Sequence, residues 1–280
     1  VGVLLAGIYP VGMKIAADYY QKGLDTALGY LVGALVLGTA LPHLINFLTI
    51  GLNWKMVIYS TSGLAFVGGI GVLLFVPDGP YRKPAIQLKL SAIFDVFRNK
   101  KFKKAAFGYF GHMWELYTFW AFIPFLIYYF NELNSIELNV SLWSFLIIAI
   151  GGVGCVIGGY ISINKGAKQT AAVALLISGL CCLLSPIIIL YSSTSIFLLF
   201  LLVWGFAVIT DSPLFSTLVA TNANAEIKGT ALTIVNCIGF ALTIISIQLI
   251  QYLSTTISSE YLFLFLVPGP VFGLISLFRK

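Results

Sequence analysis

Residues 140–191 read VSLWSFLIIAIGGVGCVIGGYISINKGAKQTAAVALLISGLCCLLSPIIILY. Two apolar runs, 140–161 and 170–191, flank a short polar turn that contains Lys165 and Lys168. Each run has the length of about 20 apolar residues that a helix needs to cross a bilayer. Neither run alternates apolar and polar residues, as a strand of a membrane barrel would. The stretch therefore predicts two membrane-spanning helices joined by a basic turn.

The rest of the chain has the same character. Of its 280 residues 59% are hydrophobic and only 9% are charged, and the mean hydropathy is +0.99. An average soluble domain carries roughly 25% charged residues. This composition excludes a soluble globular protein, a disordered chain and a nucleic-acid-binding domain. The net charge of +6 is typical of a membrane protein that keeps its basic loops in the cytoplasm.

The same length criterion, applied along the chain, predicts an all-α, polytopic transmembrane helix bundle. Nine candidate spans follow from it, at 1–18, 26–48, 55–76, 105–130, 140–161, 170–191, 195–220, 230–253 and 261–278. Lys14 comes only 13 residues into the first run, which is too short to cross before a charge. We therefore expect the chain to begin inside a span, as an N-terminally truncated sequence would.

Basic residues predict the orientation. If the chain threads back and forth, 15 of the 16 Lys and Arg residues fall on one side and only Lys55 falls on the other. Because cytoplasmic loops retain positive charge, this asymmetry places the C-terminus in the cytoplasm. We expect an integral, multi-pass protein of the plasma (inner) membrane.

The one long connection divides the chain unequally. Residues 77–104 form a basic cytoplasmic linker, which separates three spans in 1–76 from six spans in 105–280. Leu90, Ile93, Phe94 and Phe97 recur at helical spacing within it. This stripe predicts a short helix on the inner leaflet, with a regulatory or partner-binding segment as the alternative.

Several motifs recur six spans apart. Lys22-Gly23 follows the first span and Lys228-Gly229 follows the seventh, and each comes after a proline within the membrane. An offset of six spans is what two parallel six-helix halves would give. Gly151 to Gly154, Gly158-Gly159 and the turn Lys165-Gly166-Ala167-Lys168 form a further glycine-rich and basic motif.

On these motifs, with Gly2 and Ala6-Gly7-Ile8-Tyr9-Pro10, the chain resembles the major facilitator superfamily, whose members have two six-helix halves joined by a long cytoplasmic loop. The resemblance makes this chain a fragment that covers family helices four to twelve. It implies a secondary transporter of a small solute that works by alternating access. Ile163 occupies the usual acidic position of the family's loop motif, which leaves the charge relay of that motif incomplete. This departure supports the alternative of a non-transporting membrane sensor or scaffold.

Two carboxylates lie deep within predicted spans. Glu115 is about ten residues into the fourth span, and Asp211 is about ten residues from the cytoplasmic end of the seventh. The resemblance makes these spans cavity-lining helices. Charges inside a membrane are costly and mark ion or substrate pathways, so we expect both acids to hold or relay a proton. His112, three residues before Glu115, would share that proton or orient the acid. An interhelical hydrogen bond that only fixes packing is the alternative.

Other side chains are predicted to complete the pathway and its cytoplasmic gate. Aromatic and hydroxyl groups near the two acids are candidates for the substrate pathway: Tyr109, Trp114, Tyr9, Thr210 and Ser212. Pro213 removes a backbone hydrogen bond and would bend the helix or free a carbonyl. Lys14, Asp18, Lys165 and Lys168 are candidates for the gate, with an interfacial i,i+4 pair as the alternative for Lys14 and Asp18.

The sequence contains no H-E-x-x-H, G-x-S-x-G or Walker motif, so we predict that the chain is not an enzyme. Its two histidines fall in different spans and its four cysteines have no C-x-x-C spacing, so we expect no metal and no cofactor. The expected partners are a small-molecule substrate, protons as coupling ion and the lipid bilayer. We expect no nucleic acid partner and a monomer.

Overall fold

The structure, a computed structural model, describes residues 8–20, 22–49, 53–82, 96–224 and 227–279. Every regular element among them is helical, which confirms the all-α prediction. In chain order the elements are α2 Tyr9–Tyr19, α3 Leu24–Leu48, α4 Lys55–Phe75, η1 Val96–Arg98, α6 Lys100–Asn134, α7 Val140–Lys165, α8 Ala167–Tyr191, α9 Thr194–Thr210, α10 Ser212–Asn222, α11 Lys228–Leu253, η3 Ser259–Leu266 and α12 Pro268–Phe278.

Seven segments of the described chain are long and apolar enough to cross a membrane. Two of them are interrupted spans, α9 with α10 and η3 with α12. The other two predicted spans correspond to α6 and α2. α6 has 35 residues but is less apolar, because it carries six lysine, histidine or glutamate side chains before its middle and four tyrosines along its length. α2 is the 11-residue end of the first predicted span, whose earlier residues lie outside the described part.

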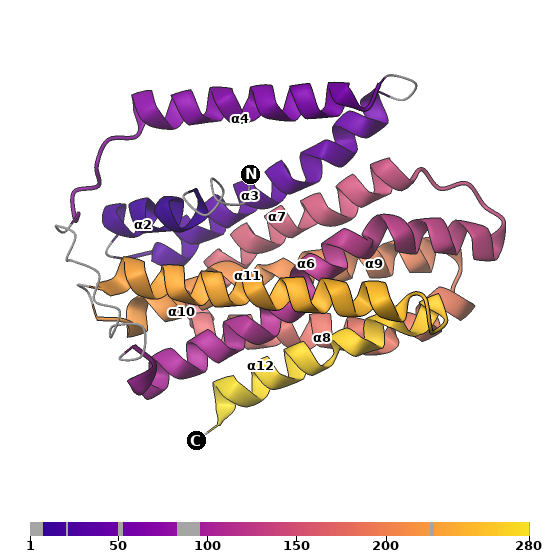
Figure 1. Ribbon diagram of the computed structural model, residues 1–280. Helices are drawn as coiled ribbons and strands as arrows, with labels where there is room; N and C mark the ends of the chain where they lie inside the picture. The colour runs from indigo at the N-terminus through magenta and orange to yellow at the C-terminus, as the bar shows by residue number, and fades with distance from the viewer. Residues whose placement is uncertain (1–7, 21, 50–52, 83–95, 225–226, 280) are drawn as a thin grey trace.

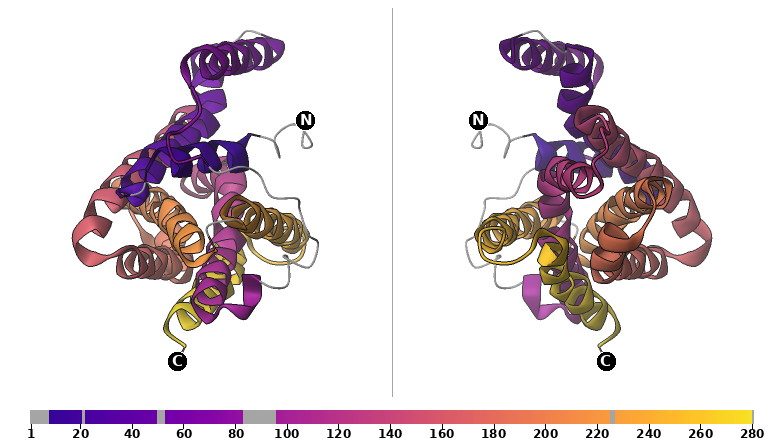
Figure 2. Two further views of the ribbon diagram at one scale, coloured as in Figure 1. Left: turned by 90° about the vertical axis from the view of Figure 1, so that its left-hand side faces the viewer. Right: turned by 90° about the vertical axis from the view of Figure 1, so that its right-hand side faces the viewer.

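The helices run roughly along one direction (Figure 1). In the end-on views of Figure 2, the six C-terminal spans gather in one bundle and α2 and α3 lie against one side of it. α4 stands apart, and none of its residues is buried. α6, α8 and α11 begin, and α7 and α12 end, on the left side of Figure 1, whereas α4 begins on the right. Lys100, Lys168, Lys228, Lys165 and Arg279 are at or next to these left-hand ends, and Lys55 begins α4.

Glycines let α3 pack closely against the six-span bundle, mainly where it crosses α7. A methyl group at Gly29 would come within 2.7 Å of the Cys155 carbonyl oxygen, and one at Gly33 within 2.9 Å of the Gly152 oxygen. Both distances are too short for a real contact, so the two backbones approach closely only because the side chains are absent.

The opposite face of α7 packs against the interrupted span α9–α10. A methyl group at Gly154 would come within 2.4 Å of Thr210 Oγ1, and one at Gly158 within 2.6 Å of Thr210 Cγ2. Gly154 and Gly158 therefore allow a close helix contact on this face of α7. Because both faces of α7 are glycine-rich, this one helix connects the N-terminal helices to the α9–α10 span.

The predicted linker at 77–104 is described only at its two ends. Leu90, Ile93 and Phe94 of the predicted surface stripe lie outside the described residues. Phe97 is in η1 and packs edge-on against Phe102, with ring centroids 5.4 Å apart. Asn99 caps α6 by accepting hydrogen bonds from two backbone amides, so the lysines at 100–104 begin the spanning helix itself. The helix therefore begins five residues before 105, where the predicted span begins.

Candidate functional site

The span formed by α9 and α10 is interrupted at Asp211, in the middle of the bundle. Pro213 follows at the start of α10, and proline has no N–H to donate to the carbonyl four residues earlier. That carbonyl belongs to Ile209, and the Cys155 thiol of α7 lies 3.5 Å from its oxygen as a donor. The predicted effect of Pro213 on the backbone is confirmed. A thiol from the neighbouring helix meets the freed carbonyl.

His112 of α6 meets Asp211 at this break. The imidazole Nδ1 lies 2.8 Å from the carboxylate Oδ1, and both side chains are 1% exposed. The rings of Tyr109 and Phe215 flank the imidazole, with centroids 5.8 Å and 6.1 Å away. His112 Nε2 and Asp211 Oδ2 have no hydrogen-bond partner among the described residues, and the Nδ1–Oδ1 contact itself is an ion-pair contact without hydrogen-bond geometry. The pair therefore offers a buried donor or acceptor on each side that the described residues do not use.

Three of the remaining predicted pathway residues, Tyr9, Tyr109 and Ser212, lie close to this pair. Tyr9 of α2 interacts with Ser212, the residue after Asp211, and packs edge-on against Phe240 with centroids 6.4 Å apart. Tyr109 is 2% exposed, and its ring fills the space that a side chain at Gly239 of α11 would need. The structure thus brings together residues from α2, α6, α10 and α11 around the helix break.

Asn236 and Thr217 are two polar residues that the sequence analysis did not select. Asn236 is 2% exposed, and its Nδ2 has no hydrogen-bond partner among the described residues. Thr217 is 6% exposed, and its Oγ1 also has no hydrogen-bond partner among the described residues. The signal for Asn236 was present in the sequence, since an amide in the apolar run TIVNCIGF is costly unless it has a partner.

Glu115 belongs to a different cluster. Its Oε1 accepts hydrogen bonds from Trp204 Nε1 at 2.7 Å and from Cys182 Sγ at 3.3 Å, and its Oε2 accepts one from Ser178 Oγ at 3.0 Å. The side chain is 1% exposed and joins α6 to α8 and α9. This placement favours the packing alternative for Glu115 over a position in a water-filled cavity.

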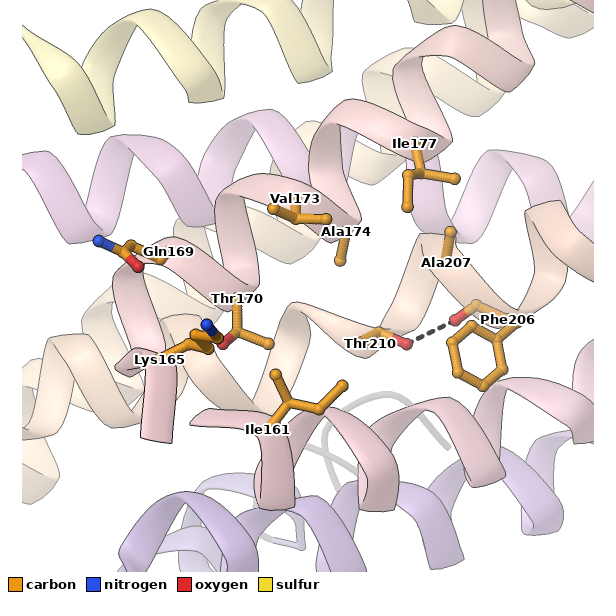
Figure 3. Close-up of a pocket in the computed structure, with 10 residues that line it drawn as sticks. All are labelled: Ile161, Lys165, Gln169, Thr170, Val173, Ala174, Ile177, Phe206, Ala207 and Thr210. Carbon is orange, nitrogen blue, oxygen red and sulfur yellow. Dashed lines mark hydrogen bonds between the residues drawn. The ribbon is translucent and has the colours of Figure 1, made fainter. Parts of the chain in front are cut away.

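Trp114 and Thr210 point away from the His112–Asp211 pair. Trp114 Nε1 donates a hydrogen bond of 3.1 Å to the Phe265 carbonyl of η3, at the periphery of the bundle. Thr210 Oγ1 donates to the Phe206 carbonyl at 2.6 Å and lines a cavity between α7, α8 and α9 (Figure 3). The structure therefore does not bring these two residues together with the other predicted pathway residues.

The four predicted gate residues form separate groups. Lys14 and Asp18 make an i,i+4 ion pair on α2, in which the lysine is 38% exposed and the aspartate 16%. Lys165 lines the cavity of Figure 3. Lys168 lies over the ring of Phe278, with its amine 4.7 Å from the centroid. A cytoplasmic gate made of all four residues stays a prediction.

No cluster of three or more His, Cys, Asp or Glu side chains that could hold a metal occurs in the part of the chain that the structure describes. Cys155, Cys181 and Cys182 are buried free thiols, and Cys237 is an exposed one. The ionisable groups of the site are His112 and Asp211, with hydroxyl and amide groups near them.

Comparison with known proteins agrees with the helical bundle. The model of the Major Facilitator Superfamily matches residues 1–247, which include α2 through most of α11. No curated protein matches the chain. The family match covers well over half of the sequence and extends across both the N-terminal helices and the six-span bundle. The chain therefore belongs to the Major Facilitator Superfamily, a family of integral, multi-pass membrane transporters.

Proposed function

We propose that the protein is a secondary transporter of a small solute, that it works by alternating access, and that protons couple to transport at His112 and Asp211. The observation that carries this proposal is the 2.8 Å contact between two otherwise enclosed ionisable groups at an interrupted helix. Interrupted helices are where transporters place polar backbone and ion-binding groups at membrane depth.

The chemistry of the pair suits proton exchange. An imidazole and a carboxylate at contact distance can share one proton, and either group alone would be costly in a low-dielectric site. A solute that takes one of the free polar atoms, His112 Nε2 or Asp211 Oδ2, would change which partner holds the proton. Binding of the solute and of the proton would then be linked through one contact.

Tyr9 supports a role for the pair in alternating access. It comes from α2, yet it interacts with Ser212 directly beside Asp211 in the six-span bundle. A movement of the N-terminal helices relative to the bundle would therefore alter the surroundings of Asp211. The α3–α7 crossing, which buries glycines on both helices, offers a smooth surface for such a movement.

The proposed orientation in the membrane follows from the charge asymmetry. We propose that the ends of α7 and α12 face the cytoplasm of a cell whose plasma (inner) membrane holds the protein, because basic residues collect at that end. The proposed partners are a small-molecule substrate, protons and the bilayer, and the proposed state is a monomer.

Proteoliposomes with an enclosed pH-sensitive dye test the coupling. With an inward proton gradient, addition of pooled metabolites or drugs is expected to change the internal pH when a transported solute is present. Asp211→Asn should abolish this solute-dependent change. Glu132→Gln, which removes a carboxylate from the exposed end of α6, is the matched control and should keep it. A variant with Asn at 211 that still moves protons with the solute would contradict the coupling site.

One observation favours a second candidate, a sensor or scaffold with the same fold. Ile163 occupies the position where the family's loop motif has an acid, and its side chain is 60% exposed with no charge to offer. In the same proteoliposomes, a solute that binds the protein with no flux in either direction would favour this candidate over transport.

A further inference from the structure

A cavity of about 330 Å³ lies outside the His112–Asp211 site, between α7, α8 and α9 (Figure 3). Ten residues line it: Ile161, Lys165, Gln169, Thr170, Val173, Ala174, Ile177, Phe206, Ala207 and Thr210. Lys165, Gln169 and Thr170 gather at one end in Figure 3, and Ile177, Ala207 and Phe206 lie toward the other. The cavity is therefore amphipathic along its length, with its only charged lining residue at one end.

The apolar part of this cavity is open at the side of the bundle. Val173 is 56% exposed and Ile177 is 38% exposed, so both present apolar surface outward. From Gln169 to Ile177, α8 advances roughly 12 Å at 1.5 Å per residue. In an integral membrane protein, a lateral groove of this depth faces acyl chains rather than water.

Lys165 has no carboxylate within ion-pair distance among the residues that the structure describes. It ends α7, where the turn at Gly166 leads directly into α8. Lys168, three residues later, is different because its amine lies over the Phe278 ring. The cation at the mouth of the groove thus has no carboxylate partner among the described residues, and Gln169 lies at the same end of the groove (Figure 3).

We propose that this groove binds an anionic phospholipid, with the headgroup phosphate at Lys165 and Gln169 and one acyl chain along Val173, Ile177 and Phe206. Charge complementarity selects the headgroup, since Lys165 is the charged residue of the lining. The apolar depth selects a lipid over a free phosphate ion, which would leave the inner part of the groove unfilled. The cavity is distinct from the His112–Asp211 contact, although its lining residue Thr210 directly precedes Asp211 in the chain and Lys165 is also a predicted gate residue.

Native mass spectrometry of the purified, delipidated protein tests the site. The probes are phosphatidylglycerol, phosphatidylcholine with the same acyl chains, and inorganic phosphate. We expect one tightly retained phosphatidylglycerol and weaker retention of phosphatidylcholine. Lys165→Gln should weaken phosphatidylglycerol binding by about fivefold, the effect of one basic residue at a membrane surface. Lys168→Gln is the matched control and should leave the binding unchanged.

A second pair of variants tests the acyl-chain part of the groove. Val173→Trp fills the groove from an exposed position, so it should displace the lipid without disturbing the core. Leu176→Trp, 48% exposed on the same helix but outside the lining, should retain the lipid. Equal retention of both lipids in all four variants, or occupation by inorganic phosphate alone, would overturn the proposal.

Discussion

Nδ1 of His112 lies 2.8 Å from Oδ1 of Asp211, and this contact joins α6 to the break between α9 and α10 with both side chains enclosed. The two residues are 99 positions apart in the chain. Because the contact combines a titratable pair with an interrupted helix, it is the part of the molecule whose removal should have the clearest consequences.

Removal of either partner should cost more stability than removal of both. His112→Leu leaves the Asp211 carboxylate without its counterpart, and loss of one member of a buried pair costs about 3 kcal/mol. The double variant His112→Leu, Asp211→Leu should recover much of that loss, since no ionisable group remains unpaired. Thermal unfolding in detergent, followed by tryptophan fluorescence, measures the coupling in a double-mutant cycle. Simple additivity of the two single effects would show that the pair is not energetically coupled.

Glu115 and Asp211 should respond differently to neutralisation. Glu115→Gln keeps an amide oxygen that can accept from Trp204, so proton-coupled transport is expected to survive it. Asp211→Asn is expected to abolish the coupling. Both variants are measured by the solute-dependent change in internal pH of proteoliposomes. Loss of coupling in Glu115→Gln, with normal expression and unfolding temperature, would return Glu115 to the proton pathway.

The Trp204 hydrogen bond gives a second test of the role of Glu115. Trp204→Phe removes the 2.7 Å donor but keeps an aromatic ring against Phe119 and Phe263. We expect a loss of about 1 kcal/mol in the free energy of unfolding, the usual size of one hydrogen bond, and unchanged coupling. Trp143→Phe is the control. Trp143 is partly buried and is not among the hydrogen-bond donors to Glu115, so its replacement should change the free energy of unfolding less.

The spans were predictable because each one is apolar on all sides and basic residues mark one end. The break near Pro213 was predictable for a different reason. A proline has no N–H, so it removes the one backbone hydrogen bond to the carbonyl four residues earlier. The extension of α6 over residues 100–104, ahead of the predicted span, was not foreseen because its lysines look like a loop. The structure shows them inside a helix that Asn99 caps.

The partners of the buried polar groups were less predictable, because neighbours across helices depend on helix rotation. His112 and Glu115 are three residues apart on α6, which puts them about 60° apart around the axis. That angle is enough for His112 to reach Asp211 while Glu115 reaches Ser178, Cys182 and Trp204. The contact of Cys155 with the Ile209 carbonyl likewise depends on the register between α7 and α9.

The close approach of α3 and α7 should be sensitive to a single methyl group. Gly29→Ala would put Cβ 2.7 Å from the Cys155 carbonyl oxygen, so the helices must separate or shift. Such overpacking is expected to cost about 1–3 kcal/mol in unfolding free energy. Gly38→Ala is the matched control, because nothing lies within 4 Å of the added methyl group there. Its expected effect is neutral or slightly stabilising, and equal losses in both variants would contradict the role of the crossing.

The charge asymmetry predicts which side of the membrane each turn faces. In a background with Cys237→Ala, which removes the exposed thiol, a single cysteine is introduced at Ser193 or at Asn164. Both positions are exposed. Asn164 lies just before α8 and Ser193 just after it, so the two positions are at opposite ends of that helix. A membrane-impermeant maleimide should label Ser193→Cys in intact cells and Asn164→Cys only after permeabilisation, because the end that carries Lys165 and Lys168 is proposed to be cytoplasmic. The reverse pattern would invert the orientation and would place the proposed lipid site in the outer leaflet.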